Sequence, residues 1–231
     1  MPFRPAALSG LTPGGKGRFP GFDVLDEVDR WDDVTAGVVL ARLDPQPGYS
    51  FFTPAEQATA DALFDRLLGQ DEEPKVPVLR LVDKRLALDM TDGWFYDGMP
   101  EDRDAWRLTL AALDKDARAD HGDHFHALSH ETQAAMLQGI FEADQWHGLK
   151  ASYVWSLWTR YACAAFYSHP WAWNEMGFGG PAYPRGYKAI GVGAREAWEQ
   201  PDRVDRDPVP WADRVERAKK EHEARTGGNS E

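Results

Sequence analysis

The densest cluster of residues that could do chemistry is D-H-G-D-H-F-H at residues 120–126. Imidazole and carboxylate groups at such short spacing are ligands for zinc or iron. The spacing matches no standard metal motif, however, and H-E-x-x-H does not occur. Gly122 favours a loop between two helices, where a solvated polar linker is the default interpretation. The alternative is a stand-alone metal-dependent enzyme whose ligands are His121, Asp123, His124 and His126.

Two other groups have the residue types of a catalytic site but lack its spacing. Ser168 and His169 are neighbours in sequence, so their side chains point apart, and no G-x-S-x-G elbow is present. Glycines 177, 179 and 180 form neither a dinucleotide fingerprint nor a phosphate loop. We therefore predict no catalytic residue and no bound cofactor in this chain.

The most unusual stretch covers residues 166–187 and reads F-Y-S-H-P-W-A-W-N-E-M-G-F-G-G-P-A-Y-P-R-G-Y. Its glycines and prolines disfavour regular helix or strand, and its aromatic rings make it too apolar for a solvated loop. We expect an ordered loop that packs on the chain's own core or on a partner. Glu175 needs a partner in such surroundings, and Arg185 is the predicted one.

Aromatic and arginine side chains dominate protein–protein hot spots, so this loop is also the predicted partner contact. An alternative is a carbohydrate-binding platform, because Trp171 and Trp173 would face the same way in an extended chain. The residues predicted to contact a partner are His169, Trp171, Trp173, Asn174, Glu175, Phe178, Gly179, Gly180, Pro181, Tyr183, Arg185 and Tyr187.

The elements that position these residues are predicted to be helices. Thr53 and Glu56 form a capping box around Pro54, and Ser129 is a second N-cap. The last helix before the aromatic loop is apolar nearly all round, which is typical of a central, enclosed helix and favours a buried Cys163. The helices are expected over about residues 54–68, 78–90, 102–119, 129–143, 148–168 and 210–225. Residues 91–100 are expected to be a loop, whose aromatics plug the bundle or extend the aromatic surface.

The predicted fold is therefore all-α, a single irregular bundle of about five to six helices with extended arms at both ends. Residues 1–50 form the N-terminal arm with an acidic segment. Residues 51–190 form the helical domain, and residues 191–231 form a C-terminal strap with a short amphipathic helix.

Composition narrows the classes of partner. The 231 residues carry a net charge of −12, which argues against nucleic acid and against anionic membrane surfaces. No apolar stretch is long and uncharged enough to insert into a membrane, and the first 20 residues show no signal peptide. A cytoplasmic location is the expectation, with export alongside a partner left open.

The order of motifs resembles a known family. F-F-T-P-A-E-Q-A-T-A-D-A-L-F-D-R-L-L is followed by V-P-V-L-R-L-V-D-K-R-L-A and F-H-A-L-S-H-E-T-Q-A-A-M-L, and the aromatic segment closes the series. Over about residues 50–187 the chain resembles the gluconate 2-dehydrogenase subunit 3 family, the small subunits of flavoprotein sugar dehydrogenases.

The resemblance implies a small, helical, cofactor-free subunit. Its partner would be a large subunit of the glucose-methanol-choline (GMC) oxidoreductase type, which holds FAD and oxidises a sugar or another alcohol. The small subunit would bind this partner and stabilise it or assist its maturation. Many family members carry a twin-arginine export signal, and residues 1–20 contain none, which favours a cytoplasmic complex.

Overall fold

The computed structural model describes residues 19, 21–43, 48–71, 73–191, 193–201 and 219–220. The chain divides into two units, Met1–Gln200 and Pro201–Glu231. Of the second unit only Pro201, Lys219 and Lys220 are described, and the two lysines are helical. The predicted helix over 210–225 thus lies almost wholly outside the described residues.

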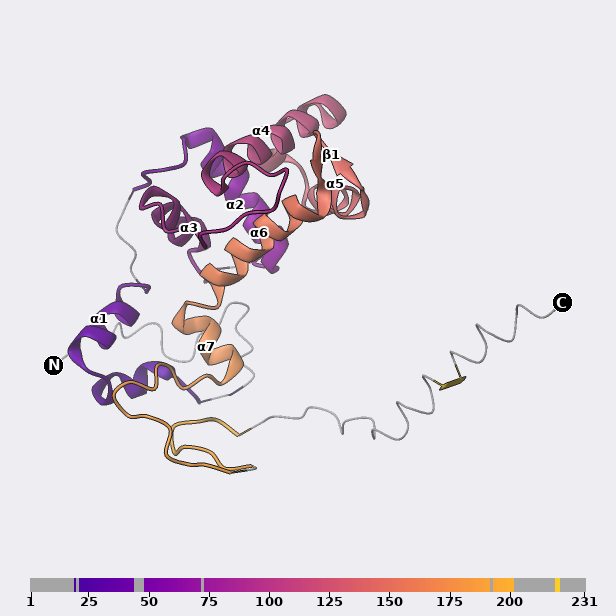
Figure 1. Cartoon of the computed structure of the whole chain (residues 1–231). Coiled ribbons are helices and arrows are strands. Elements are labelled where there is room, and N and C mark those ends of the chain that lie inside the picture. Colours follow the sequence, from indigo (N-terminus) through magenta and orange to yellow (C-terminus); the bar gives the residue numbers. More distant parts are fainter. Residues whose placement is uncertain are drawn as a thin grey trace. The chain divides into compact units, whose positions relative to one another are not determined.

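The main core of the first unit is built by helices, which confirms the all-α prediction. They are α2 (Pro54–Leu68), α3 (Val78–Ala87), α4 (Asp102–His121), η2 (Phe125–Ala127), α5 (His130–Glu142) and α6 (Ala151–Phe166). Helix α2 contacts all the others, and α6 also packs on α3 and α5 (Figure 1). Trp106, Trp158 and Tyr161 are among the largest side chains that are fully buried between them.

Local sequence signals set the bounds of these helices. Thr53 accepts a hydrogen bond from the backbone N–H of Glu56, and the Glu56 carboxylate accepts one from the backbone of Thr53, so the predicted capping box is confirmed. Gly69 ends α2 in the left-handed conformation at φ 64°, which glycine adopts without steric cost. Ser129 caps α5 as predicted. Cys163, by contrast, is exposed on α6, so the prediction that it is buried is wrong.

A short hairpin precedes α6 where the sequence suggested the helix itself. Strands β1 (Gln145–Trp146) and β2 (Leu149–Lys150) pair antiparallel, with Trp146 opposite Leu149. His147 and Gly148 both have positive φ, at 48° and 76°, as a two-residue hairpin turn requires.

The acidic segment of the predicted N-terminal arm is also helical. It forms η1 (Val24–Arg30) and α1 (Asp33–Leu40). Asp23 caps η1 and Asp32 caps α1, because a carboxylate accepts the unpaired N–H groups of a helix's first turn. The two helices surround a second, smaller hydrophobic cluster of Val24, Leu25, Trp31, Val39 and Trp173.

The aromatic segment holds a helix that the sequence did not suggest. Pro170–Met176 forms α7, so the expectation that the whole of 166–187 is irregular is wrong. His169 is the N-cap, Pro170 sits in the first turn, and Gly177 ends the helix at φ 71°. Trp171 packs in the main core, whereas Trp173 packs in the small cluster, so α7 belongs to both. In the part of the chain described, no helix is long and apolar enough to cross a membrane.

Candidate functional site

The aromatic segment lies against the N-terminal helices, and α7 contacts η1 directly. The Asn174 side chain accepts a hydrogen bond from the backbone N–H of Val24 at 2.8 Å and donates one to Asp23 at 3.2 Å. Helix η1 is therefore held by a side chain that follows it by 150 residues.

Two glycines let aromatic rings approach the backbone after α7. A Cβ atom at Gly179 would lie 2.6 Å from the ring and the carbonyl oxygen of Trp198. Gly180 has φ 80°, and a Cβ there would enter the space that the Trp31 ring occupies. Both glycines were predicted to contact a partner. Both are buried, and in this chain they allow close internal packing.

Arg185 does not pair with Glu175, so that prediction is wrong. Its guanidinium binds Glu27 of η1 at 2.8 Å and donates to the carbonyl oxygens of Gly179 and Pro181 at 2.9 and 2.7 Å. The same group lies 3.9 Å from the centre of the Trp198 ring. Arg185 therefore ties the loop after α7 to η1 and to Trp198.

His169 is fully buried between α6 and α7. Its Nδ1 accepts the backbone N–H of Trp171 at 3.2 Å, which places the ring proton on Nε2, and the ring also interacts with the backbone of Arg42. Burial lowers the pKa of His169 from 6.5 to about 4. The Ser168 hydroxyl donates to the carbonyl oxygen of Ala165 at 2.8 Å, so these neighbours form no nucleophile–base pair.

The side chains predicted to contact a partner thus differ in burial. Four side chains are buried inside this chain: His169, Trp171, Trp173 and Asn174. Trp171 and Trp173 pack in different clusters, so they do not form the flat sugar-binding platform expected of an extended chain. Phe178, Tyr183 and Tyr187 are exposed at 39%, 66% and 57%, and Glu175, Pro181 and Arg185 are half-buried. The partner role of the segment stays a prediction, now centred on the three exposed rings.

A second group of exposed apolar side chains lies on the loop between α3 and α4. It comprises Leu88, Met90, Trp94, Phe95 and Tyr96, with exposures between 37% and 60%. Monomeric proteins seldom leave large apolar patches open, and such patches mark sites of interaction. We refer to these five residues as the aromatic loop surface.

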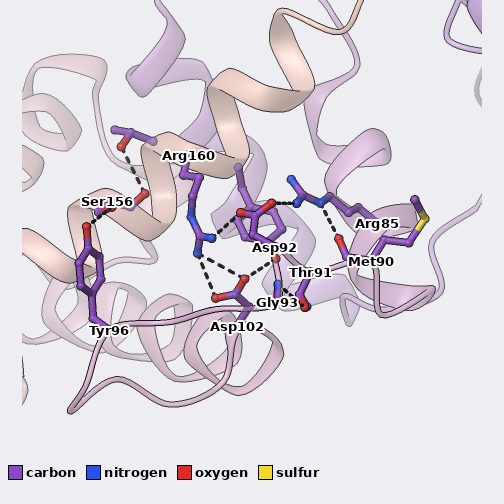
Figure 2. A network of polar contacts seen from close by, with 11 residues as sticks. Arg85, Met90, Thr91, Asp92, Gly93, Tyr96, Asp102, Ser156 and Arg160 are labelled. Atoms are coloured by element: carbon purple, nitrogen blue, oxygen red, sulfur yellow. Dashed lines mark hydrogen bonds and ion pairs between the residues drawn. The ribbon is translucent and has the colours of Figure 1, made fainter.

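A network of charged groups holds this loop on the bundle (Figure 2). Asp92 forms ion pairs with Arg85 of α3 and Arg160 of α6. Arg160 also reaches Asp102, the first residue of α4, at 3.1 Å, and the Tyr161 hydroxyl donates to Asp102 at 2.6 Å.

Aromatic contacts hold the same loop further along. The Tyr96 ring stacks on Tyr153 at 4.1 Å, and the Tyr96 and Ser156 hydroxyls lie 3.4 Å apart. Burial and the neighbouring Asp102 raise the pKa of Tyr161 far above its usual value, so its hydroxyl stays a donor. The Arg160 guanidinium also lies 4.6 Å from the centre of the Trp94 ring, and Trp94 and Phe95 remain 48% and 54% exposed.

An apolar groove runs beside this network, between α3 and α6. Its volume is about 270 Å³. The residues that line it are Arg42, Leu81, Val82, Lys84, Arg85, Leu88, Met90, Tyr161, Ala164, Ala165 and Ser168. We call it the α3–α6 groove.

The residues of the 120–126 cluster are not gathered around a common point. His124 lies 3.0 Å from Asp114 of α4 and stacks on His126, while His121 and Asp123 are exposed. Among the residues that the structure describes, no group of three or more His, Cys, Asp or Glu side chains is placed to hold a metal ion. These histidines are accounted for as surface residues of the α4–α5 connection.

Comparison with known proteins agrees with this geometry. Neither the search of curated proteins nor the search of solved structures gave a match. The family model described as gluconate 2-dehydrogenase subunit 3 matches residues 54–180, which is more than half of the 231 residues. The match begins at Pro54, the first residue of α2, and ends at Gly180, against Trp31. The chain belongs to the gluconate 2-dehydrogenase subunit 3 family.

Proposed function

We propose that this chain is a non-catalytic small subunit that binds and stabilises, or helps to mature, an FAD-containing dehydrogenase subunit of the GMC type. The family is that of a subunit of a multi-subunit dehydrogenase, so an oxidoreductase partner follows from membership. The proposal goes beyond family membership in three respects: the flavin, the GMC type of the partner, and its sugar or alcohol substrate.

The supporting observation is where the exposed apolar side chains lie. Among the described residues, eight of the fifteen exposed large hydrophobic side chains lie on two segments, the aromatic loop surface and the rings of Phe178, Tyr183 and Tyr187. Aromatic side chains fixed in advance lose little entropy on binding, which is why such residues dominate interface energetics. The two segments together fit a surface that a larger protein covers.

The test is purification of the tagged chain from its native host, followed by measurement of bound flavin and of alcohol-dependent dye reduction. A stoichiometric flavoprotein with sugar or alcohol dehydrogenase activity is the expected result. A chain that elutes without flavin, or that oxidises a substrate by itself, would contradict the proposal.

Single substitutions locate the contact. Phe95→Ser and Tyr183→Ser remove rings that are 54% and 66% exposed, so both variants should keep their helical circular dichroism. Each should weaken the complex about tenfold or more, as truncation of an interface aromatic commonly does. Leu108→Ser, which removes a 47% exposed side chain of α4 outside both segments, is the matched control and should bind like the wild type.

A further inference from the structure

The α3–α6 groove has an apolar interior. Val82 and Tyr161 are buried there, Leu81 is half-buried, and small alanine side chains on α6 leave the space open. Its rim is apolar as well, because Leu88 and Met90 are 59% and 60% exposed. Removing such surface from water is favourable by roughly 25 cal/mol per Å², so a complementary apolar side chain would gain free energy by entering.

The charge of the groove is opposite to the charge of the chain. The protein has a net charge of −12, yet three cations line the groove and none of its described lining residues is Asp or Glu. Arg85 is paired with Asp92. The Arg42 guanidinium donates to the backbone oxygen of Ser168 at 2.7 Å, and neither Arg42 nor Lys84 forms an ion pair within the described residues. Among the residues that the structure describes, two positive charges therefore border the apolar interior without a matching carboxylate.

We propose that the α3–α6 groove docks a segment of the partner dehydrogenase subunit in which an aliphatic side chain lies next to a carboxylate. This inference rests on the proposed function and extends it to a specific contact. The aliphatic side chain enters between Leu81 and Ala165, and the carboxylate meets Arg42 and Lys84. The volume of about 270 Å³ lies just below the usual size of small-molecule pockets, and the rim is open, which favours a protein segment as the occupant.

Ala164→Glu is the sharpest test, because it narrows the groove and adds a negative charge where the partner's carboxylate would lie. Ala164 is exposed near the end of α6, so the change leaves the core intact. Ala119 is exposed at the same distance from the end of α4, which makes Ala119→Glu a control for charge and for helix position. We expect Ala164→Glu to raise the dissociation constant of the purified complex about 30-fold, and Ala119→Glu to change it less than about twofold.

A second pair of variants tests the charge alone. Lys84→Glu reverses an exposed cation of the groove, and Lys115→Glu reverses an exposed cation of α4. Lys84→Glu should weaken the complex about fivefold or more at low salt, with the difference shrinking as salt is added, because screening weakens interactions between exposed charges. Lys115→Glu should behave like the wild type.

The possible outcomes separate the two proposals. If the wild-type chain binds no flavin-containing subunit, the proposed function and the docking site fail together. If the wild-type chain binds the flavin-containing subunit, and both Ala164→Glu and Lys84→Glu bind it as tightly as the wild type does, only the proposed docking site is wrong. A third outcome has two parts: decanoate raises the melting temperature of the isolated wild-type chain but not of Ala164→Glu, and Ala164→Glu does not change the dissociation constant of the complex. In that case the groove binds a small amphipathic acid, and the docking proposal is overturned.

Discussion

His169 is the residue with the largest expected effect of pH on stability. Burial lowers its pKa to about 4 in the folded chain, whereas the unfolded chain titrates near 6.5. Between these values the unfolded state binds more protons, so the stabilising contribution is complete above pH 6.5 and is lost as the pH falls toward 4. The full effect amounts to about 3 kcal/mol.

His169→Asn should remove this pH dependence. Asparagine keeps an acceptor for the Trp171 N–H and is a good N-cap, but it does not titrate. Denaturant unfolding of both proteins from pH 7 to pH 4 gives the difference in unfolding free energy. That difference should shift in favour of the variant by about 3 kcal/mol as the pH is lowered. A constant difference would mean that His169 does not titrate in this window.

Gly180 should not accept any side chain. Gly180→Ala combines a positive φ, which costs about 1–2 kcal/mol for an L-residue, with a clash against the Trp31 ring. We expect a loss of more than about 2 kcal/mol in the unfolding free energy. Gly93→Ala is the control, because Gly93 also has positive φ but no atom near its Cβ position, and should cost only about 1 kcal/mol.

At the scale of single residues, the sequence indicated that the side chains of residues 166–187 make aromatic contacts, but it did not indicate which of them are buried. The abundance of tryptophan at 171 and 173 indicated a contact surface, and whether that surface faces inward depends on what packs against it. Trp171 packs in the main core, whereas Trp173 and Asn174 pack against Trp31 and η1, about 140 to 150 residues away. Arg185 illustrates the same limit, because Glu27 is closer in space than the nearby Glu175 that the sequence favoured.

Among the elements, the loop between α3 and α4 is held on the bundle by a few charged groups. Asp92→Asn weakens both ion pairs of this loop without leaving a buried charge unpaired, since Asp102 keeps Arg160 and Tyr161. Exposed ion pairs contribute little to global stability, so the unfolding free energy should fall by less than about 1 kcal/mol. Amide exchange across 90–98 should nevertheless become faster.

Hydrogen exchange followed by mass spectrometry would test this prediction. Asp97→Asn, an exposed change on the same loop, is the control and should leave the exchange of 90–98 unchanged. Unaltered protection in Asp92→Asn would show that the aromatic contacts alone hold the loop, for example the stacking of Tyr96 on Tyr153.

Two of the predicted helices have clear end signals in the sequence. Thr53, Gly69 and Ser129 mark α2 and α5 because their side chains or backbone conformations satisfy helix ends locally. Helix α7 was missed because the glycines after Met176 dominated the composition of the whole segment. His169, Pro170 and Gly177 were nonetheless the signals of its start and end.

At the scale of the whole molecule, the proposed partner should stabilise the chain by mass action. A ligand that binds only the folded state raises the unfolding free energy by about 2.7 kcal/mol at 100 times its dissociation constant. The melting temperature of the chain should therefore rise with the concentration of the flavoprotein subunit. No rise at saturating partner would argue against a stabilising role.

The family match and the described fold coincide over the bundle and α7. Residues 54–180 cover every helix of the main core, whereas η1 and α1 precede the match. The predicted division at residues 50 and 190 stays a prediction, and the chain separates into its two units after Gln200.

The bond between Val24 and Asn174 has a consequence for biosynthesis. A ribosome adds about 5–20 residues each second, so helix η1 is made roughly 8–30 seconds before the Asn174 amide group that binds it. During that interval Trp31 and its apolar neighbours have no cover from α7, and a nascent-chain chaperone has time to bind them.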